Sequence, residues 1–214
     1  MWHLMNCSAE HDCVVIGAGA AGIAAARVLA RAGRAVCVIE ARDRLGGRAF
    51  TQEVAGHPLD LGCGWLHSAD RNVLVPLASE GGFDIDREIP PWQKAPDERS
   101  FSREDHRAYR AEMGGYGALI QALAAGLDIR FNVQACRIDH ASIPMRVETN
   151  RGTLTARTVI VTVPTSIIAT GALRFSPALS EHVEAASLLP LGVADKLFLA
   201  LDGAEEFDVD ARIY

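Results

Sequence analysis

The sequence contains little that would place the protein in a membrane, on nucleic acid or around a metal ion. No stretch approaches the roughly 18 uninterrupted apolar residues of a membrane-spanning helix. The net charge of −6 disfavours a nucleic-acid partner. The five cysteines form no CxxC pair, so we expect neither a metal site nor a disulfide framework. Only two of the 21 basic residues are lysines, Lys94 and Lys196, so a lysine in an unusual position is informative.

The N-terminal residues lack the features of a secretory signal. Residues 1–11 contain neither a basic n-region nor an apolar h-region. We therefore expect a short disordered lead at 1–11 and a cytoplasmic protein. The 214 residues are 49% hydrophobic, which is enough to bury the core of one large domain or two small ones.

The first part of the chain has the pattern of a strand, a helix and a second strand. Residues 13–16 form a continuous apolar run, typical of a strand buried on both faces. An alanine-rich helix is predicted at 20–32, ended by Gly33, and a second buried strand is predicted at 35–39. This order predicts an α/β fold with a mostly parallel sheet and a βαβ start.

Later segments add further predicted elements. Helices are predicted at 72–79 and 116–125, and strands near 129–139, 145–149, 153–156 and 158–163. A last strand is predicted at 191–201, with Lys196 between apolar neighbours. Because an ammonium group is costly to bury, Lys196 is either a functional residue or a lysine that extends to the surface.

A glycine-rich turn joins the first strand to the helix. Gly17 permits the tight turn, Gly19 lets the backbone approach a pyrophosphate, and Gly22 lets the helix pack closely on the strand. The turn also contains Ala18 and Ala21, and the positive end of the helix dipole would face the phosphates. The pattern predicts a dinucleotide site and leaves NAD and FAD open.

The segment after the second strand carries charged groups suited to a nucleotide. Glu40 ends that strand, where its carboxylate can accept hydrogen bonds from ribose hydroxyls. Arg42 and Arg48 can neutralise a diphosphate, and Gly46 and Gly47 permit a close approach of the backbone.

The run from 40 to 51, EARDRLGGRAFT, contains a GGRxxT segment that ends at Thr51. Here the sequence resembles the flavin-containing amine oxidase superfamily, which includes monoamine and polyamine oxidases. The resemblance implies an FAD-binding, Rossmann-like domain. In this segment the cofactor-binding residues that it implies are Glu40, Ala41, Arg42, Gly46, Gly47 and Arg48.

Residues 60–67, DLGCGWLH, are similar to the segment that passes the flavin ring in this family. The resemblance implies that Gly64 and Trp65 lie at the cofactor. The triplet that ends at His67 is most similar to the polyamine-oxidase branch and implies that His67 lies near the substrate amine. A lone histidine is also common as a hydrogen-bonded surface or core residue, and that alternative stays open.

Two more positions follow from the resemblance. Residues 132–135 are similar to the strand that pairs with the adenine, where Ala135 stands in place of the usual valine. Lys196 occupies the position of a lysine that is hydrogen-bonded through a water molecule to flavin N5. Lys196 and His67 are therefore the candidate catalytic residues.

The resemblance covers residues 12–83 and 114–201 and implies a shortened family member that lacks the C-terminal part. It implies an FAD-binding domain made of 12–83 and 114–166. A polar linker at 84–113 would replace the family's helical substrate segment, and a partial substrate domain would follow at 167–214. The last predicted strand is apolar on both faces, so we expect self-association or a partner chain that covers it.

The favoured function is that of an FAD-dependent oxidoreductase acting on a small-molecule amine. It would oxidise a C–N bond to an imine, with hydride transfer to flavin N5 and oxygen as the electron acceptor that yields peroxide. Two alternatives remain. One is a truncated flavin-binding protein that has no turnover or is completed by a partner chain, and the other is an NAD-dependent dehydrogenase.

Overall fold

The computed structural model describes residues 10–86, 107–109, 115–193 and 195–207. The chain forms two compact units, each assembled from separated pieces of sequence. The first unit comprises residues 1–48 and 120–193, and the second comprises 49–119 and 194–214. The predicted lead at 1–11 and linker at 84–113 lie largely outside the described residues, and the predicted domain boundaries remain predictions.

The first unit is built on a seven-stranded sheet of order β11-β8-β9-β10-β1-β2-β7. The pairs of β1 with β10, β1 with β2, β2 with β7 and β11 with β8 are parallel, whereas β9 runs antiparallel to both β8 and β10. The strands are β1 (His11–Ile16), β2 (Val36–Ile39), β7 (Ile129–Arg130), β8 (Ala135–Asp139), β9 (Met145–Thr149), β10 (Gly152–Val161) and β11 (Arg174–Ser176). This mostly parallel α/β sheet confirms the predicted fold class.

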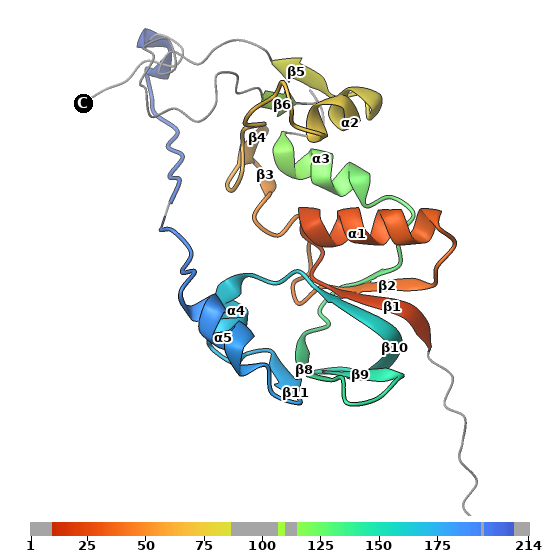
Figure 1. Cartoon of the computed structure of the whole chain (residues 1–214). Helices are drawn as coiled ribbons and strands as arrows, with labels where there is room; N and C mark the ends of the chain where they lie inside the picture. Colours follow the sequence, from red (N-terminus) through yellow and green to blue (C-terminus); the bar gives the residue numbers. More distant parts are fainter. Residues whose placement is uncertain (1–9, 87–106, 110–114, 194, 208–214) are drawn as a thin grey trace, which may run out of the picture. The chain divides into compact units, whose positions relative to one another are not determined.

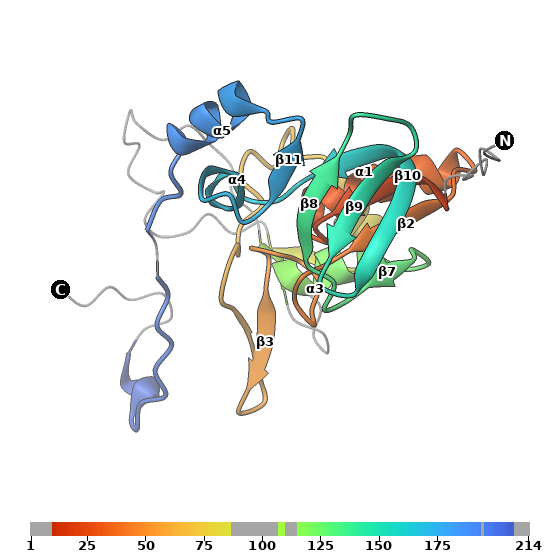
Figure 2. The same ribbon diagram turned by 90° about the horizontal axis from the view of Figure 1, so that it is seen from below.

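Helix α1 (Ala20–Arg31) packs against β1 and β2 on one face of the sheet, while β9 and β8 continue the same sheet beyond β10 (Figures 1 and 2). The helix forms where predicted because its residues are mostly strong helix formers. It ends at Gly33, whose φ of +71° suits a left-handed position and whose amide donates to the carbonyl of Ala30 at 2.9 Å.

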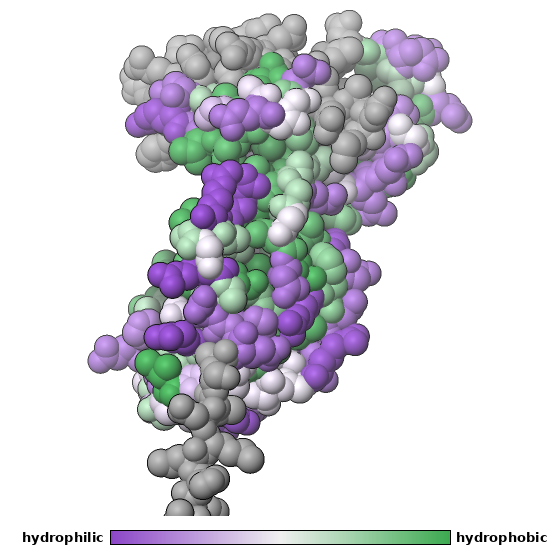
Figure 3. Space-filling view, turned by 90° about the vertical axis from the view of Figure 1, so that its right-hand side faces the viewer, coloured by the Kyte–Doolittle hydropathy of each residue, from purple (hydrophilic) through white to green (hydrophobic). Residues whose placement is uncertain are grey.

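Alternate residues of β1 supply two apolar cores, as expected for a strand buried on both faces. Cys13 and Val15 face the side of α1, where they pack with Ala26 and Val38. The other face carries the cluster of Val14, Ile16, Cys37, Ile39, Val133, Ala135, Ile138, Val147, Ala156 and Leu173. In Figure 3, hydrophilic residues dominate the lower part of the view, where the strands of this unit lie.

Three elements of the first unit were not predicted. They are α4 (Thr165–Ala169), β11 and α5 (Ser180–Ser187), and α4 packs against α5. The two strands predicted at 153–156 and 158–163 are one continuous strand, β10. The residues near 129–139 form the short strands β7 and β8, with a turn between them.

The second unit contains short elements. A hairpin joins β3 (Thr51–Val54) to β4 (His57–Asp60), and β5 (Asp84–Asp86) pairs with β6 (Arg107–Tyr109). The helices are α2 (Leu74–Glu80), the first half of α3 (Tyr116–Leu123) and the 3₁₀ turn η2 (Ala204–Glu206). The predicted helices at 72–79 and 116–125 thus correspond to α2 and α3.

The strand predicted at 191–201 was wrong. Residues 191–193 and 195–200 have no regular secondary structure, and their side chains are exposed, Lys196 included. The alternation of apolar residues is typical of a strand, but a strand forms only where a neighbouring strand pairs with it. Among the described residues, none pairs with this segment.

Candidate functional site

The glycine turn between β1 and α1 combines a tight backbone with an uncapped helix start. Gly17 adopts a left-handed backbone with φ of +107°, and its amide donates to the carbonyl of Ile39 at 2.8 Å. A Cβ at Gly22 would lie 1.9 Å from the carbonyl oxygen of Gly17, so only glycine allows the helix to approach the turn. Helix α1 begins after Gly19 without a side-chain cap, which leaves its first amides available.

Glu40 lies directly against this turn. It is 9% exposed and is the one buried charged residue in the described part of the chain. Its Oε2 accepts the amide of Ala18 at 2.8 Å, and its Oε1 accepts the amide of Arg42 at 3.0 Å. These two bonds fix the carboxylate beside the glycine turn, so the structure brings the two predicted parts of the nucleotide site together.

The Gly46–Gly47 pair closes over the same turn. The amide of Gly46 donates to the carbonyl of Ala18 at 2.9 Å, and Gly46 forms a parallel bridge with Gly19. A Cβ at Gly47 would lie 3.3 Å from the Cα of Gly19. The glycine turn at 17–22 and the Gly46–Gly47 pair are separated in the sequence, but they contact each other through backbone atoms.

Arg44, which the sequence analysis did not single out, shapes the Gly46–Gly47 loop. Its Nη1 donates to the carbonyl of Leu45 at 3.2 Å and to that of Gly47 at 3.0 Å. Burial, together with the nearby charge of Arg42, lowers the pKa of the Arg44 guanidinium. The sequence signal that could have indicated Arg44 is the presence of three arginines within the seven residues 42–48.

The remaining predicted residues of the first unit lie around this core of the site. Ala21, Ala41, Arg42 and Arg48 are exposed, so their side chains are accessible to a ligand. The predicted adenine segment runs beside Glu40, because the amide of Val133 donates to the carbonyl of Glu40 at 2.9 Å. Ala135, the first residue of β8, is buried in the core next to that segment.

These residues fit the adenosine diphosphate half of FAD. The turn is tightly packed because its glycines lack side chains, the helix offers uncapped amides, and the carboxylate is fixed where ribose hydroxyls can donate to it. Two exposed arginines on the same loop can balance the charge of the diphosphate.

In the second unit the structure brings Lys196 close to Gly64. Lys196 Nζ donates to the carbonyl oxygens of Asp60 at 3.0 Å and Gly62 at 2.6 Å. A Cβ at Gly64 would lie 3.3 Å from Lys196 Nζ. Trp65, the next residue, is half-buried, while His67 is exposed.

Asp60 and Tyr116 were missed by the sequence analysis. The carboxylate of Asp60 accepts the hydroxyl of Thr51 and the amide of Tyr116. Burial raises the pKa of the Tyr116 phenol, and the nearby Cys63 adds to the shift. Asp60 opens the segment 60–67 and Thr51 ends the GGRxxT run, so both motifs contained the signal. Thr51 and Asp60 pair within the β3–β4 hairpin, whereas the contact of Asp60 with Tyr116 is long-range.

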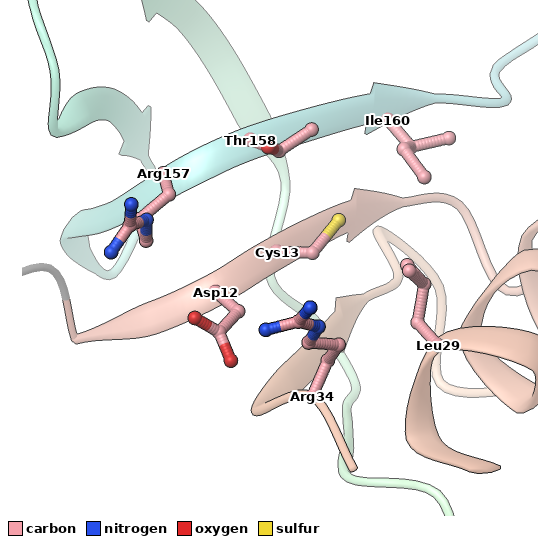
Figure 4. Close-up of a pocket in the computed structure, with 7 residues that line it drawn as sticks. All are labelled: Asp12, Cys13, Leu29, Arg34, Arg157, Thr158 and Ile160. Carbon is pink, nitrogen blue, oxygen red and sulfur yellow. The ribbon is translucent and has the colours of Figure 1, made fainter. Parts of the chain in front are cut away.

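A cavity of about 390 Å³ lies elsewhere in the first unit. Figure 4 shows its lining, in which Arg34 and Arg157 extend beside Asp12 and Cys13 near the start of β1. The glycine turn follows the opposite end of β1, at the carboxyl ends of the parallel strands where ligands bind in such sheets. The cavity therefore does not belong to the nucleotide site. Burial raises the pKa of the Cys13 thiol, which makes it a poor nucleophile.

Within the described residues, no group of three or more histidine, cysteine, aspartate or glutamate side chains could hold a metal ion. Across the same residues, no helix is long and apolar enough to cross a membrane.

Comparison with known proteins finds a family model that matches most of the chain. The model describes flavin containing amine oxidoreductases and matches residues 20–100 and 93–206. The two matched ranges overlap at 93–100. This overlap lies inside 84–113, the stretch predicted to replace a longer segment of the family.

Two curated relatives are oxidases of small amines by name. Putrescine oxidase from Kocuria rosea is 49% identical over 75 residues, which cover 35% of this chain and 16% of the relative. Polyamine oxidase 4 from Oryza sativa subsp. japonica is 26% identical over 293 aligned positions, which cover 92% of this chain and 60% of the relative. That alignment is longer than the chain, because the relative has internal residues that this chain lacks. The chain spans less than two thirds of both relatives.

A solved structure of wild-type putrescine oxidase bound to putrescine is similar to this chain. The TM-score is 0.66 at 19% identity, and the match covers 83% of this chain and 63% of that chain. At this identity the similarity shows the fold, which agrees with the α/β sheet of the first unit.

Proposed function

The chain belongs to the family of flavin-containing amine oxidoreductases, and we propose that it oxidises a small amine with FAD held by its first unit. Family membership confirms the predicted cofactor, FAD. It does not support the NAD-dependent dehydrogenase that the glycine turn alone left open. The activity, the substrate and the residues that carry them are proposals.

The observation that supports this function most strongly is the contact of Glu40 with the glycine turn. Its carboxylate is held by the amides of Ala18 and Arg42, so it is oriented before a ligand arrives. In our proposal Glu40 accepts hydrogen bonds from the ribose, the amides at the start of α1 bind the pyrophosphate, and Arg42 and Arg48 balance its charge.

When bound, FAD would supply the redox chemistry, namely oxidation of the C–N bond of the amine by hydride removal, with oxygen reduced to peroxide. The chain's own part is orientation and electrostatics. The amine must be neutral, because an ammonium has no lone pair to assist loss of the hydride. We assign His67, which is exposed, to orient the amine, and Lys196 to place a positive charge at the reacting end.

The substrate class that we propose is a small aliphatic amine such as a diamine or polyamine. The names of the relatives, putrescine oxidase and polyamine oxidase, support this class. The net charge of −6 also favours the approach of cationic amines.

Two measurements on the purified protein test the proposal. An absorption spectrum with maxima at roughly 370 and 450 nm, as for any oxidised flavin, would identify the bound cofactor. A peroxide assay over a panel of monoamines, diamines and polyamines would then identify the substrate. A Glu40→Ala variant is the control, since peroxide should fall together with the flavin absorbance. A colourless protein that gives no peroxide after incubation with FAD would contradict the function.

A second candidate is a flavin-binding protein without turnover, or one that a partner chain completes. It is favoured by the observation that an aligned relative has internal residues that this chain lacks. The same experiment separates the two, because this candidate predicts flavin absorbance without peroxide for every amine in the panel.

A further inference from the structure

Asp60 connects three segments of the second unit. Its carboxylate accepts the hydroxyl of Thr51 in β3 and, at 3.1 Å, the amide of Tyr116 at the start of α3. Its backbone carbonyl accepts Lys196 Nζ at 3.0 Å. The side chain and the backbone of one residue thus join β3, α3 and the segment that carries Lys196.

The contacts of the carboxylate form a closed network. The Thr51 hydroxyl donates to Asp60 and accepts the amide of Gly117 at 2.9 Å, so both of its functions are used. Gly117 must be glycine here, because a Cβ would lie 2.3 Å from the amide nitrogen of Thr51. The carboxylate also faces the amino end of α3, where the helix dipole favours a negative charge. Its orientation is therefore fixed from several sides.

The same residue begins the turn that holds the Lys196 ammonium. The carbonyl oxygens of Asp60 and Gly62 both accept Lys196 Nζ, at 3.0 and 2.6 Å, and hydrogen bonds from a charged donor are stronger than neutral ones. Two carbonyls of one turn converge on one cation only if the intervening backbone is held in a particular conformation. The anchored side chain of Asp60 provides that constraint at one end of the turn.

We propose that Asp60 is a positioning residue that acts through Lys196: its carboxylate, locked by Thr51 and α3, aims the Asp60 and Gly62 carbonyls at the ammonium. The importance of Lys196 for turnover rests on the proposed function. The positioning of Lys196 by Asp60 concerns only residues of this chain and is measurable without the cofactor.

The test is the rate at which an amine-reactive reagent labels Lys196 in the full chain, measured by mass spectrometry. Lys94, the other lysine of the sequence, is followed in the same digest as an internal reference. Asp60→Asn places an amide donor against the amides of α3, and Thr51→Val removes the hydroxyl while keeping the shape. Thr51→Ser keeps the hydroxyl, and Asp70→Asn changes an exposed aspartate of the same unit.

We expect Lys196 labelling, relative to Lys94, to rise about tenfold in Asp60→Asn and Thr51→Val, the effect of losing a hydrogen bond to a charged group. Thr51→Ser and Asp70→Asn should label as the wild type does. Unchanged labelling in both disruptive variants would overturn the proposal. If Asp60→Asn does not fold, the comparison of Thr51→Val with Thr51→Ser decides.

Failure of the proposed function would be visible separately, as absence of flavin or of peroxide in the wild type. A wild type that lacks activity but shows the labelling pattern would support the positioning role and contradict the activity. If the wild type is active but Asp60→Asn and Thr51→Val leave Lys196 labelling unchanged, the activity is supported and the positioning role is contradicted.

Discussion

At the scale of single residues, Glu40 is a side chain whose removal should weaken cofactor binding. We expect Glu40→Ala to weaken FAD binding by about 1.5–3 kcal/mol, because charge-assisted hydrogen bonds to the ribose are lost. Titration of the apo-protein with FAD, and with NAD in parallel, measures this effect. Glu184→Ala, an exposed glutamate of the same unit, is the control. Tighter binding of NAD than of FAD by the wild type would contradict the prediction.

Lys196 should affect one half of the reaction more than the other. Lys196→Met keeps much of the stem volume and removes the charge that the carbonyls of Asp60 and Gly62 hold. We expect reduction of the flavin by amine to persist and its reoxidation by oxygen to slow about tenfold or more, as for removal of one electrostatic group from a reacting centre. Stopped-flow absorbance of the two half-reactions measures this. Lys94→Met is the matched control, and an unchanged reoxidation rate would show that Lys196 has no such role.

At the scale of elements, the turn between β1 and α1 depends on close backbone packing. A Cβ at Gly22 would lie 1.9 Å from the carbonyl of Gly17, whereas a Cβ at Gly192 would meet nothing within 4 Å. We expect Gly22→Ala to push α1 from the turn and to abolish measurable FAD binding, while Gly192→Ala binds normally. Flavin absorbance after gel filtration measures both. Wild-type flavin content in Gly22→Ala would show that the turn tolerates a side chain and is not the phosphate site.

The sequence predicted the elements whose signal is local. β1, α1 and β2 were recognisable because apolar runs, helix formers and a terminal glycine lie next to one another in the chain. Helix α4 was missed because it has only five residues, and α5 because its sequence, SEHVEAAS, has few large apolar residues to mark a buried face. The strand at 191–201 was wrong because alternation alone does not supply a pairing partner. In the candidate site, Glu40 and the glycines were predicted from spacing, and the structure brings them together. The contact of Asp60 with Tyr116 joins residues 56 positions apart, which no local pattern contains.

At the scale of the whole molecule, the segment after α5 exposes many apolar side chains. Val193 is 96% exposed, Leu197 83% and Leu199 69%. Contiguous exposed apolar residues favour association, so we expect the purified chain to self-associate. Light scattering with binding of a hydrophobic dye measures this, and Leu197→Ser combined with Leu199→Ser should reduce both signals. A wild type that stays monomeric and binds no dye would contradict the expectation.

The pairing of β1 with β10 has a consequence for how the chain folds. Val14 lies opposite Val159 and Ile16 opposite Val161, so the central parallel pair of the first unit joins residues about 145 positions apart. The loop closure that such a pair requires slows folding, and the first unit cannot complete its sheet before the residues of β10 are present. During synthesis on the ribosome, β1, α1 and β2 emerge early. Their apolar faces stay without β10 until most of the second unit has been translated. The nascent chain therefore passes through a long interval in which the glycine turn at 17–22 has been synthesised but β10, the strand that supports it, has not.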